Sequence, residues 1–178
     1  MTRIRRSDGE LTVTISDNEF ITLSRLEADL LGALADRLTA VADGVAGVDR
    51  MFPDAYRDDA EAAAEFHSLT DVDLVTAKSE AARSVMTAFV GAEAQPSGSL
   101  WRRSASRTIT ADADLSLALM RNLTDLRLMI ADRLSIESDD DDGSSGDTGD
   151  RIVYWWLGET QERLVTALAA DAFGAEDR

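Results

Sequence analysis

Apolar and polar residues alternate strictly near the start of the chain, a pattern typical of a β-strand that buries one face. The alternation covers residues 11–15, and it follows a basic segment at 3–6 and a polar turn. These features predict a small N-terminal antiparallel β-hairpin. A short third strand over 20–23 extends the predicted hairpin region to residues 1–23.

Beyond the hairpin, apolar residues recur every three or four positions, which is the spacing of helices that bury one side. Ser24 with Glu27 and Thr70 with Asp73 have the spacing of capping boxes, so we place helix starts there. The pattern predicts helices over 24–43, 60–68, 70–89, 111–136 and 151–172. The predicted fold class is mainly α, a bundle of about five helices with the small hairpin packed on it.

The chain is expected to form a single domain over residues 1–178, because this length suffices for one hydrophobic core. Two polar segments interrupt the helical pattern. Residues 91–100, within a helical core at 24–136, have the composition of a mobile linker, and a strand at 107–110 follows. Residues 137–150 are rich in aspartate, serine and glycine, which predicts a disordered acidic loop before the C-terminal helix.

The composition excludes several classes of function. Acidic residues outnumber basic ones by 34 to 18, and the formal net charge of -16 repels nucleic acid and anionic membranes. The absence of cysteine excludes disulfides, thiolate nucleophiles and cysteine-ligated metals. Because the chain has neither a secretory signal nor a long apolar run, we expect no membrane association and a cytoplasmic location.

Arginines form two clusters despite the acidic composition. Their members are Arg3, Arg5 and Arg6 near the N-terminus, and Arg102, Arg103 and Arg107 before the fourth predicted helix. If the strand at 107–110 pairs with the hairpin, the clusters merge into one patch that can bind phosphates or an acidic partner. The alternative is local ion pairing that offsets the surrounding carboxylates.

Residues with catalytic or metal-binding chemistry are few. The acidic run at 139–142 before Gly143 lacks the first carboxylate and the final glutamate of an EF-hand loop, so we interpret it as a solvated linker. His67 is the only histidine, and we expect it at the surface or in a cap because no recognisable nucleophile accompanies it. We therefore predict no cofactor, no metal and no enzymatic activity.

Three consecutive aromatic residues lie in the last predicted helix, namely Tyr154, Trp155 and Trp156. Successive helical residues are about 100° apart around the axis, so the three side chains cannot all face inward. At least one is expected at the surface or against another chain. Trp155 is our candidate for an interface with a partner or with a second copy in a homodimer, against ordinary core packing as the alternative.

Six stretches of the chain together resemble a known family. They are LEADLL at 26–31, FPDAYRDD at 52–59, AEF at 64–66, NLTDLRL at 122–128, DRL at 132–134 and YWWL at 154–157. This set spans nearly the whole chain and resembles the actinobacterial AosR-like family, formerly a domain of unknown function and named for an oxidative-stress transcriptional regulator. The resemblance implies transcription regulation through contact with a sigma factor and promoter DNA. It also implies a genomic setting beside a Clp protease adaptor and cysteine-biosynthesis genes.

Redox sensing in the AosR-like family is attributed to cysteine, and this chain has none, so thiol switching is excluded here. Two hypotheses of different class stay open. One is a transcription-associated regulator of the stress response that acts by protein-protein contact with DNA contact in addition. The other is an interaction or adaptor protein linked to Clp proteolysis or sulfur metabolism that does not bind DNA.

Within the family-like loop, Phe52 precedes two residues, Pro53 and Asp54, that we expect to fix the chain path. We expect Tyr56 and Arg57 to supply side chains to a pocket or partner. On the helix predicted at 111–136, three polar residues stand among apolar ones: Asn122, Asp125 and Arg127. A buried polar group must be matched, so we expect Asp125 to pair with an arginine inside the core.

Overall fold

The computed structural model describes residues 2–7, 10–39, 48–53, 55–56, 58–97, 104–138, 141, 143 and 146–174. Its elements in chain order are β1 (Arg3–Ser7), β2 (Glu10–Ser16), α1 (Asp17–Thr39), the 3-10 turn η1 (Asp49–Met51), α2 (Ala60–Gly91), β3 (Ala94–Ser97), β4 (Ser104–Ala111), α3 (Ala113–Arg133) and α4 (Thr148–Gly174). The mainly helical class is as predicted. The described residues form four α-helices where five were expected, and the predicted hairpin is part of a four-stranded sheet.

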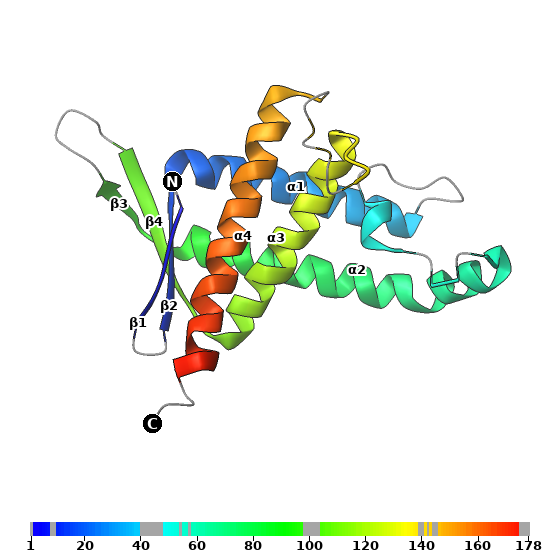
Figure 1. The fold of residues 1–178 in the computed structure, drawn as a ribbon, viewed down its shortest axis with the longest axis horizontal. Coiled ribbons are helices and arrows are strands. Elements are labelled where there is room, and N and C mark those ends of the chain that lie inside the picture. Colours follow the sequence, from blue (N-terminus) through cyan, green and yellow to red (C-terminus); the bar gives the residue numbers. More distant parts are fainter. Residues whose placement is uncertain are drawn as a thin grey trace.

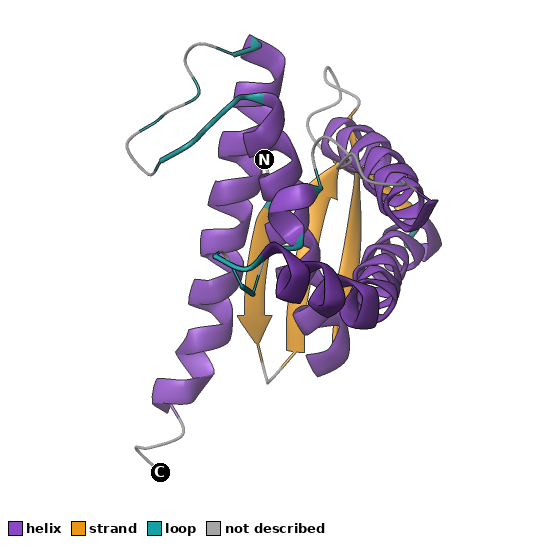
Figure 2. Ribbon diagram, turned by 90° about the vertical axis from the view of Figure 1, so that its right-hand side faces the viewer, coloured by secondary structure: helices purple, strands orange, loops and turns teal. Residues whose placement is uncertain are grey.

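The sheet has the strand order β1-β2-β4-β3, and each neighbouring pair is antiparallel. The predicted hairpin and the predicted strand at 107–110 are therefore confirmed as β1, β2 and part of β4. All four helices lie on the same side of the sheet (Figures 1 and 2). Leu11, Val13 and Ile109 are buried on this inner face, whereas threonines alternate with them toward the outer face.

Helix α1 begins seven residues earlier than expected, and this explains why 20–23 is helical and not a strand. Ser16 and Glu19 form the capping box, since the Glu19 carboxylate accepts hydrogen bonds from the Ser16 amide and hydroxyl, each at 2.7 Å. The Ser24 hydroxyl, expected to cap the helix, instead donates to the carbonyl of Phe20. The predicted start at Ser24 is therefore wrong.

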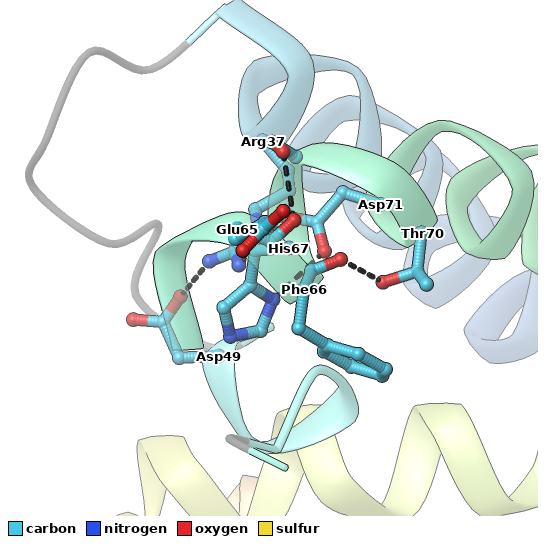
Figure 3. A network of polar contacts seen from close by, with 8 residues as sticks. Arg37, Asp49, Glu65, Phe66, His67, Thr70 and Asp71 are labelled. Carbon is cyan, nitrogen blue, oxygen red and sulfur yellow. Dashed lines mark hydrogen bonds and ion pairs between the residues drawn. The ribbon is translucent and has the colours of Figure 1, made fainter. Parts of the chain in front are cut away.

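Helix α2 is continuous where two separate helices were predicted. At the expected break, the Thr70 hydroxyl donates to the carbonyl of Phe66 within the same helix, at 2.8 Å. Asp71 accepts a hydrogen bond from Arg37 of α1, and its carboxylate also contacts His67, each at 2.9 to 3.0 Å (Figure 3). Because these contacts satisfy the polar side chains, Thr70 and Asp71 do not interrupt the helix. The first turns of α2 project beyond the other helices (Figure 1).

The two predicted flexible segments contain ordered structure. β3 occupies part of the expected linker at 91–100, because its residues pair with β4, while 98–100 lie outside the described residues. In the expected disordered loop at 137–150, Gly143 is buried and adopts a positive φ of 66° that suits glycine. A Cβ on Gly146 would lie 2.6 Å from the Leu134 side chain, so close packing on α3 requires glycine here.

The remaining helices are capped and packed around α3. The Asp112 carboxylate caps α3 and the Asp147 carboxylate caps α4, which begins at Thr148 and not at the predicted position 151. Buried leucines of α1, α3 and α4 join the inner face of the sheet in one apolar cluster. Among the described helices, none is long and apolar enough to cross a membrane.

Candidate functional site

A cluster of polar side chains lies inside the helical bundle, where α1, α2 and α3 meet. We call it the buried polar cluster, and its members are Glu27 of α1, Lys78 of α2, and Asn122 and Asp125 of α3. The apolar stripe of each helix carries these residues inward, because each lies three or four positions from a buried apolar residue. Glu27 is only 2% exposed, so its charge state matters for the stability of the fold.

The Glu27 carboxyl accepts a hydrogen bond from the Asn122 side-chain amide. Glu27 Oε2 and Asn122 Oδ1 have no hydrogen-bond partner among the described residues. Burial raises the pKa of Glu27 to about 7, against the lowering effect of Asn122, and the charge of Asp125 raises it further. Protonation would turn Oε2 from an acceptor into a donor, and the unpartnered Asn122 Oδ1, on the amide that already binds Glu27, is an acceptor for it.

Asp125 is buried, as expected, but its partner is not an arginine. Its carboxylate lies 2.6 Å from Nζ of Lys78, the only lysine of the chain. Burial raises the pKa of Asp125 even though the hydrogen bond and charge of Lys78 lower it. The Lys78 ammonium also lies 5.8 Å from the centre of the Phe52 ring, so the pair is shielded by an aromatic face.

The buried polar cluster has the geometry of a structural network. Glu27, Asn122 and Asp125 are each at most 3% exposed, and Lys78 and Asp125 border a shallow depression beside Arg121 and Thr124. Within the described part of the chain, no three metal-ligating side chains come together. The cluster can hold a proton and joins three helices, because its hydrogen bonds link α1 to α3 and α2 to α3.

A second feature is an open groove along the outer side of α3 and α4, which we call the α3–α4 groove. Its volume of about 1390 Å³ exceeds that of typical small-molecule pockets, which suits a segment of a macromolecule. α4 supplies most of the lining, and α3, η1 and the connection between α3 and α4 supply the rest. The lining residues are Arg50, Arg127, Leu128, Ala131, Ile136, Glu137, Ser138, Asp141, Arg151, Ile152, Tyr154, Trp155, Trp156, Gly158, Glu159, Gln161, Glu162, Val165 and Thr166.

The three consecutive aromatic residues divide between core and groove, which confirms that at least one reaches the surface. The Trp156 indole N–H donates to Thr2 and to the Glu19 carboxylate at 3.0 and 3.1 Å, so its ring ties α4 to the N-terminal strand region. The Tyr154 ring lies 5.2 Å from the Arg127 guanidinium carbon. Trp155 is 59% exposed, and it is the aromatic residue most available to a partner.

Arg127 forms one wall of the groove. Its guanidinium donates to Gln161 of α4 at 2.6 Å, and Gln161 in turn donates to Thr124 of α3 at 2.8 Å. A Cβ on Gly158 would lie 3.6 Å from the guanidinium carbon, which is ordinary van der Waals contact, so Arg127 packs directly over this position of α4. Arg127 is thus a bridge between the helices as well as a groove residue.

The described arginines of the predicted basic patch do not share one face of the sheet. β4 pairs with β2, but Arg3 and Arg5 lie on the outer face of the sheet, while Arg6 and Arg107 lie on the inner side. Arg107 donates to the carbonyl of Ala92 at 2.7 Å and lies 4.4 Å from the Phe20 ring. Arg107 therefore makes local contacts within the protein and is not part of a binding patch. Arg102 and Arg103 lie outside the described residues.

The family-like loop is mainly structural where it is described. Phe52 is buried beneath Arg37, whose guanidinium carbon lies 4.9 Å from the ring centre, whereas Pro53 is exposed. Tyr56 is exposed and contacts Phe66 edge to face at 6.4 Å, away from the residues that line the α3–α4 groove. Asp54 and Arg57 lie outside the described residues, as does most of the acidic run at 139–142.

The sequence prediction missed two residues of the buried polar cluster. Glu27 was interpreted as half of a capping box, although its spacing from Leu23, Leu30 and Leu34 places it on the apolar stripe of α1. Lys78 is the only lysine and follows Val75 by three residues, which places it close to the buried side of α2. Charged residues on apolar helical stripes are thus the signal that could have revealed the cluster. His67, expected at the surface or in a cap, is partly buried against Asp71.

Comparison with known proteins adds a family but no activity. No curated protein and no solved structure is significantly similar to the chain. A family model described as a domain of unknown function, DUF2017, matches residues 1–168. The match covers both the buried polar cluster and the α3–α4 groove, and the chain therefore belongs to the DUF2017 family.

Proposed function

We propose that this protein is a non-enzymatic regulator that acts by binding a protein partner in the α3–α4 groove, in the control of transcription under oxidative stress. The observation that carries the proposal is the exposure of Trp155 and Ile152 on one face of α4. These residues are 59% and 65% exposed and lie one helical turn apart at the same end of the groove.

Exposed tryptophan beside an aliphatic residue is the composition of an interface hot spot, in which few side chains supply most of the binding energy. Arg127 and Tyr154 stand at the wall of the same groove, and arginine and tyrosine are also enriched at such interfaces. The buried polar cluster holds α3, one side of the groove, to α1 and α2. The chemistry of this surface favours binding over catalysis.

The regulatory part of the proposal rests on the resemblance to the AosR-like family, for which a sigma factor is the expected partner. The adaptor hypothesis, with a partner from Clp proteolysis or sulfur metabolism, uses the same groove and differs in what binds there. Direct contact with promoter DNA would fall to Arg3 and Arg5 on the outer face of the sheet. The formal net charge of -16 opposes binding to DNA, so the proposal gives the main role to protein contact.

Affinity capture with three forms of the full chain tests the proposal. Wild type, Trp155→Ala and Leu69→Ala are used to capture proteins from lysates of peroxide-treated cells, and the bound proteins are identified by mass spectrometry. Leu69 is the matched control because it is 72% exposed on α2, away from the groove. We expect a sigma factor with wild type and Leu69→Ala, and its loss with Trp155→Ala.

The outcomes separate the hypotheses. Clp or sulfur-metabolism proteins captured in a Trp155-dependent manner support the adaptor hypothesis over the regulator. An identical set of proteins with all three forms contradicts binding through the groove. A gel-shift titration on promoter DNA at several salt concentrations completes the test, since steep salt dependence supports direct contact with phosphates.

A further inference from the structure

Charges around the α3–α4 groove are not balanced. Four acidic residues line it, namely Glu137, Asp141, Glu159 and Glu162, against three arginines, Arg50, Arg127 and Arg151. Glu137 and Asp141 come from the connection between α3 and α4, and Glu159 and Glu162 come from α4. The described lining therefore has one more acidic than basic side chain, on a chain whose formal net charge is -16.

Two of the three arginines are already engaged within the protein. Arg50 lies 3.4 Å from Asp132 and donates to the carbonyl of Ile136. Arg127 donates to Gln161 and faces the Tyr154 ring. These contacts occupy donor groups of Arg50 and Arg127 that an acidic partner would need.

Apolar and acidic residues alternate in blocks along the exposed face of α4. Ile152 and Trp155 lie at one end, Glu159 and Glu162 follow, and Val165 lies at the other end. Helical spacing of three or four residues places them on one stripe, which is about 20 Å long at 1.5 Å per residue. Glu159 also pairs with Arg163 at 2.8 Å, which leaves Glu162 as the more available of the two central carboxylates.

We propose that the α3–α4 groove binds a basic amphipathic helix of a partner protein, with apolar anchors at both ends and lysine or arginine between them. One anchor packs against Ile152 and Trp155 and the other against Val165, while the basic residues meet Glu162 and Glu159. The inference rests on the proposed function, because it names the chemistry of the partner for the same groove. An amphipathic helix laid in a groove between two helices is an established mode of recognition.

Charge decides against the other occupants of the groove. A second copy of the chain carries the same net charge of -16, so two copies repel one another at this surface. Nucleic acid would bring its phosphates against the acidic lining, which is also unfavourable. A basic partner is instead attracted at long range, and this attraction weakens as salt increases.

Selection from a phage-displayed library tests this inference. The probe is a library of random peptides of about 16 residues, long enough to cover the groove as a helix. The bait is the full chain, and enriched peptides are then synthesised and titrated against wild type, Trp155→Ala, Glu162→Gln and Leu69→Ala. We expect basic peptides with apolar residues about three turns apart. Their affinity should fall about tenfold or more with Trp155→Ala and remain unchanged with Leu69→Ala.

The remaining outcomes distinguish the inference from the proposed function. Peptides that depend on Trp155 but are acidic or uncharged overturn the inference and leave groove binding intact. If the selected peptides bind Trp155→Ala and wild type with equal affinity, or if no selected peptide depends on Trp155, both the inference and the proposed function are contradicted. A wild-type dimer that Trp155→Ala converts to a monomer in sedimentation would show that a second copy covers the groove, and that result also overturns the inference.

Discussion

Replacing Glu27 with glutamine should remove a pH dependence of stability that originates in the buried polar cluster. Glutamine has the shape of a protonated glutamic acid, and its amide can donate to Asn122 Oδ1 as the acid proton does. The variant therefore mimics the protonated state at every pH. We expect Glu27→Gln to match wild type in acid and to exceed it in stability above neutral pH.

The sign and size follow from the pKa of Glu27. Burial raises this pKa from 4.5 to about 7, so the folded state binds the proton more tightly than the unfolded state. The stabilisation by the proton is complete below pH 4.5 and is lost as pH rises through the folded-state value. Each pKa unit corresponds to about 1.4 kcal/mol, so the rise from 4.5 to about 7 amounts to roughly 3 kcal/mol in the free energy of unfolding.

Urea unfolding followed by circular dichroism, at pH values between 5 and 8, measures this effect. The quantity of interest is the difference between Glu27→Gln and wild type, because other carboxylates such as Glu19 contribute equally to both proteins. Hydrogen bonds from Ser16 and Thr2 hold the pKa of Glu19 below its usual value although burial raises it, so its own contribution has the opposite sign. Glu80→Gln, on the exposed side of α2, is the control. Parallel stability curves for wild type and Glu27→Gln would refute the reasoning.

Three further substitutions test the packing of the fold by chemical or thermal unfolding. Asp125→Ala should lower the free energy of unfolding by about 3 kcal/mol or more, because Lys78 loses its partner; adding Lys78→Met should recover part of the loss, and no recovery would contradict the pairing. Ser16→Ala removes the capping box and should cost about 1 kcal/mol, whereas an unchanged melting temperature would argue against the cap. Gly146→Val should cost about 1 to 3 kcal/mol because its Cβ would press on buried Leu134, and normal stability would show that this segment does not pack there.

Short-range patterns predicted the elements whose environment is encoded locally. The alternation at 11–15 identified β2, because each apolar residue had to face the same side of a sheet. The apolar stripe of the helix predicted at 111–136 identified α3 in the same way. The geometry of three consecutive aromatic residues also required one of them to leave the core, although it could not show that the exposed one is Trp155.

Features decided by long-range contacts could not be predicted in this way. Ser16, Ser24 and Thr70 each begin a sequence with the spacing of a capping box, and only Ser16 caps a helix. The hydroxyls of Ser24 and Thr70 donate to carbonyls four residues earlier, because the helix already extends past them. The pairing of β1 with β2 was predicted, but the faces on which Arg3 and Arg107 lie depend on the register between strands. A one-residue difference in register reverses the face of every side chain.

Site-specific photo-cross-linking in living cells tests the central claim, that a protein partner binds the α3–α4 groove. A photoreactive benzoyl-phenylalanine is placed at position 152, one turn from Trp155, and in a second variant at position 69 on α2 as the control. Both positions are exposed, so neither replacement should disturb the core. We predict a discrete adduct of higher mass from position 152 and none from position 69. The absence of an adduct at position 152, or the same adduct from both positions, would contradict the claim.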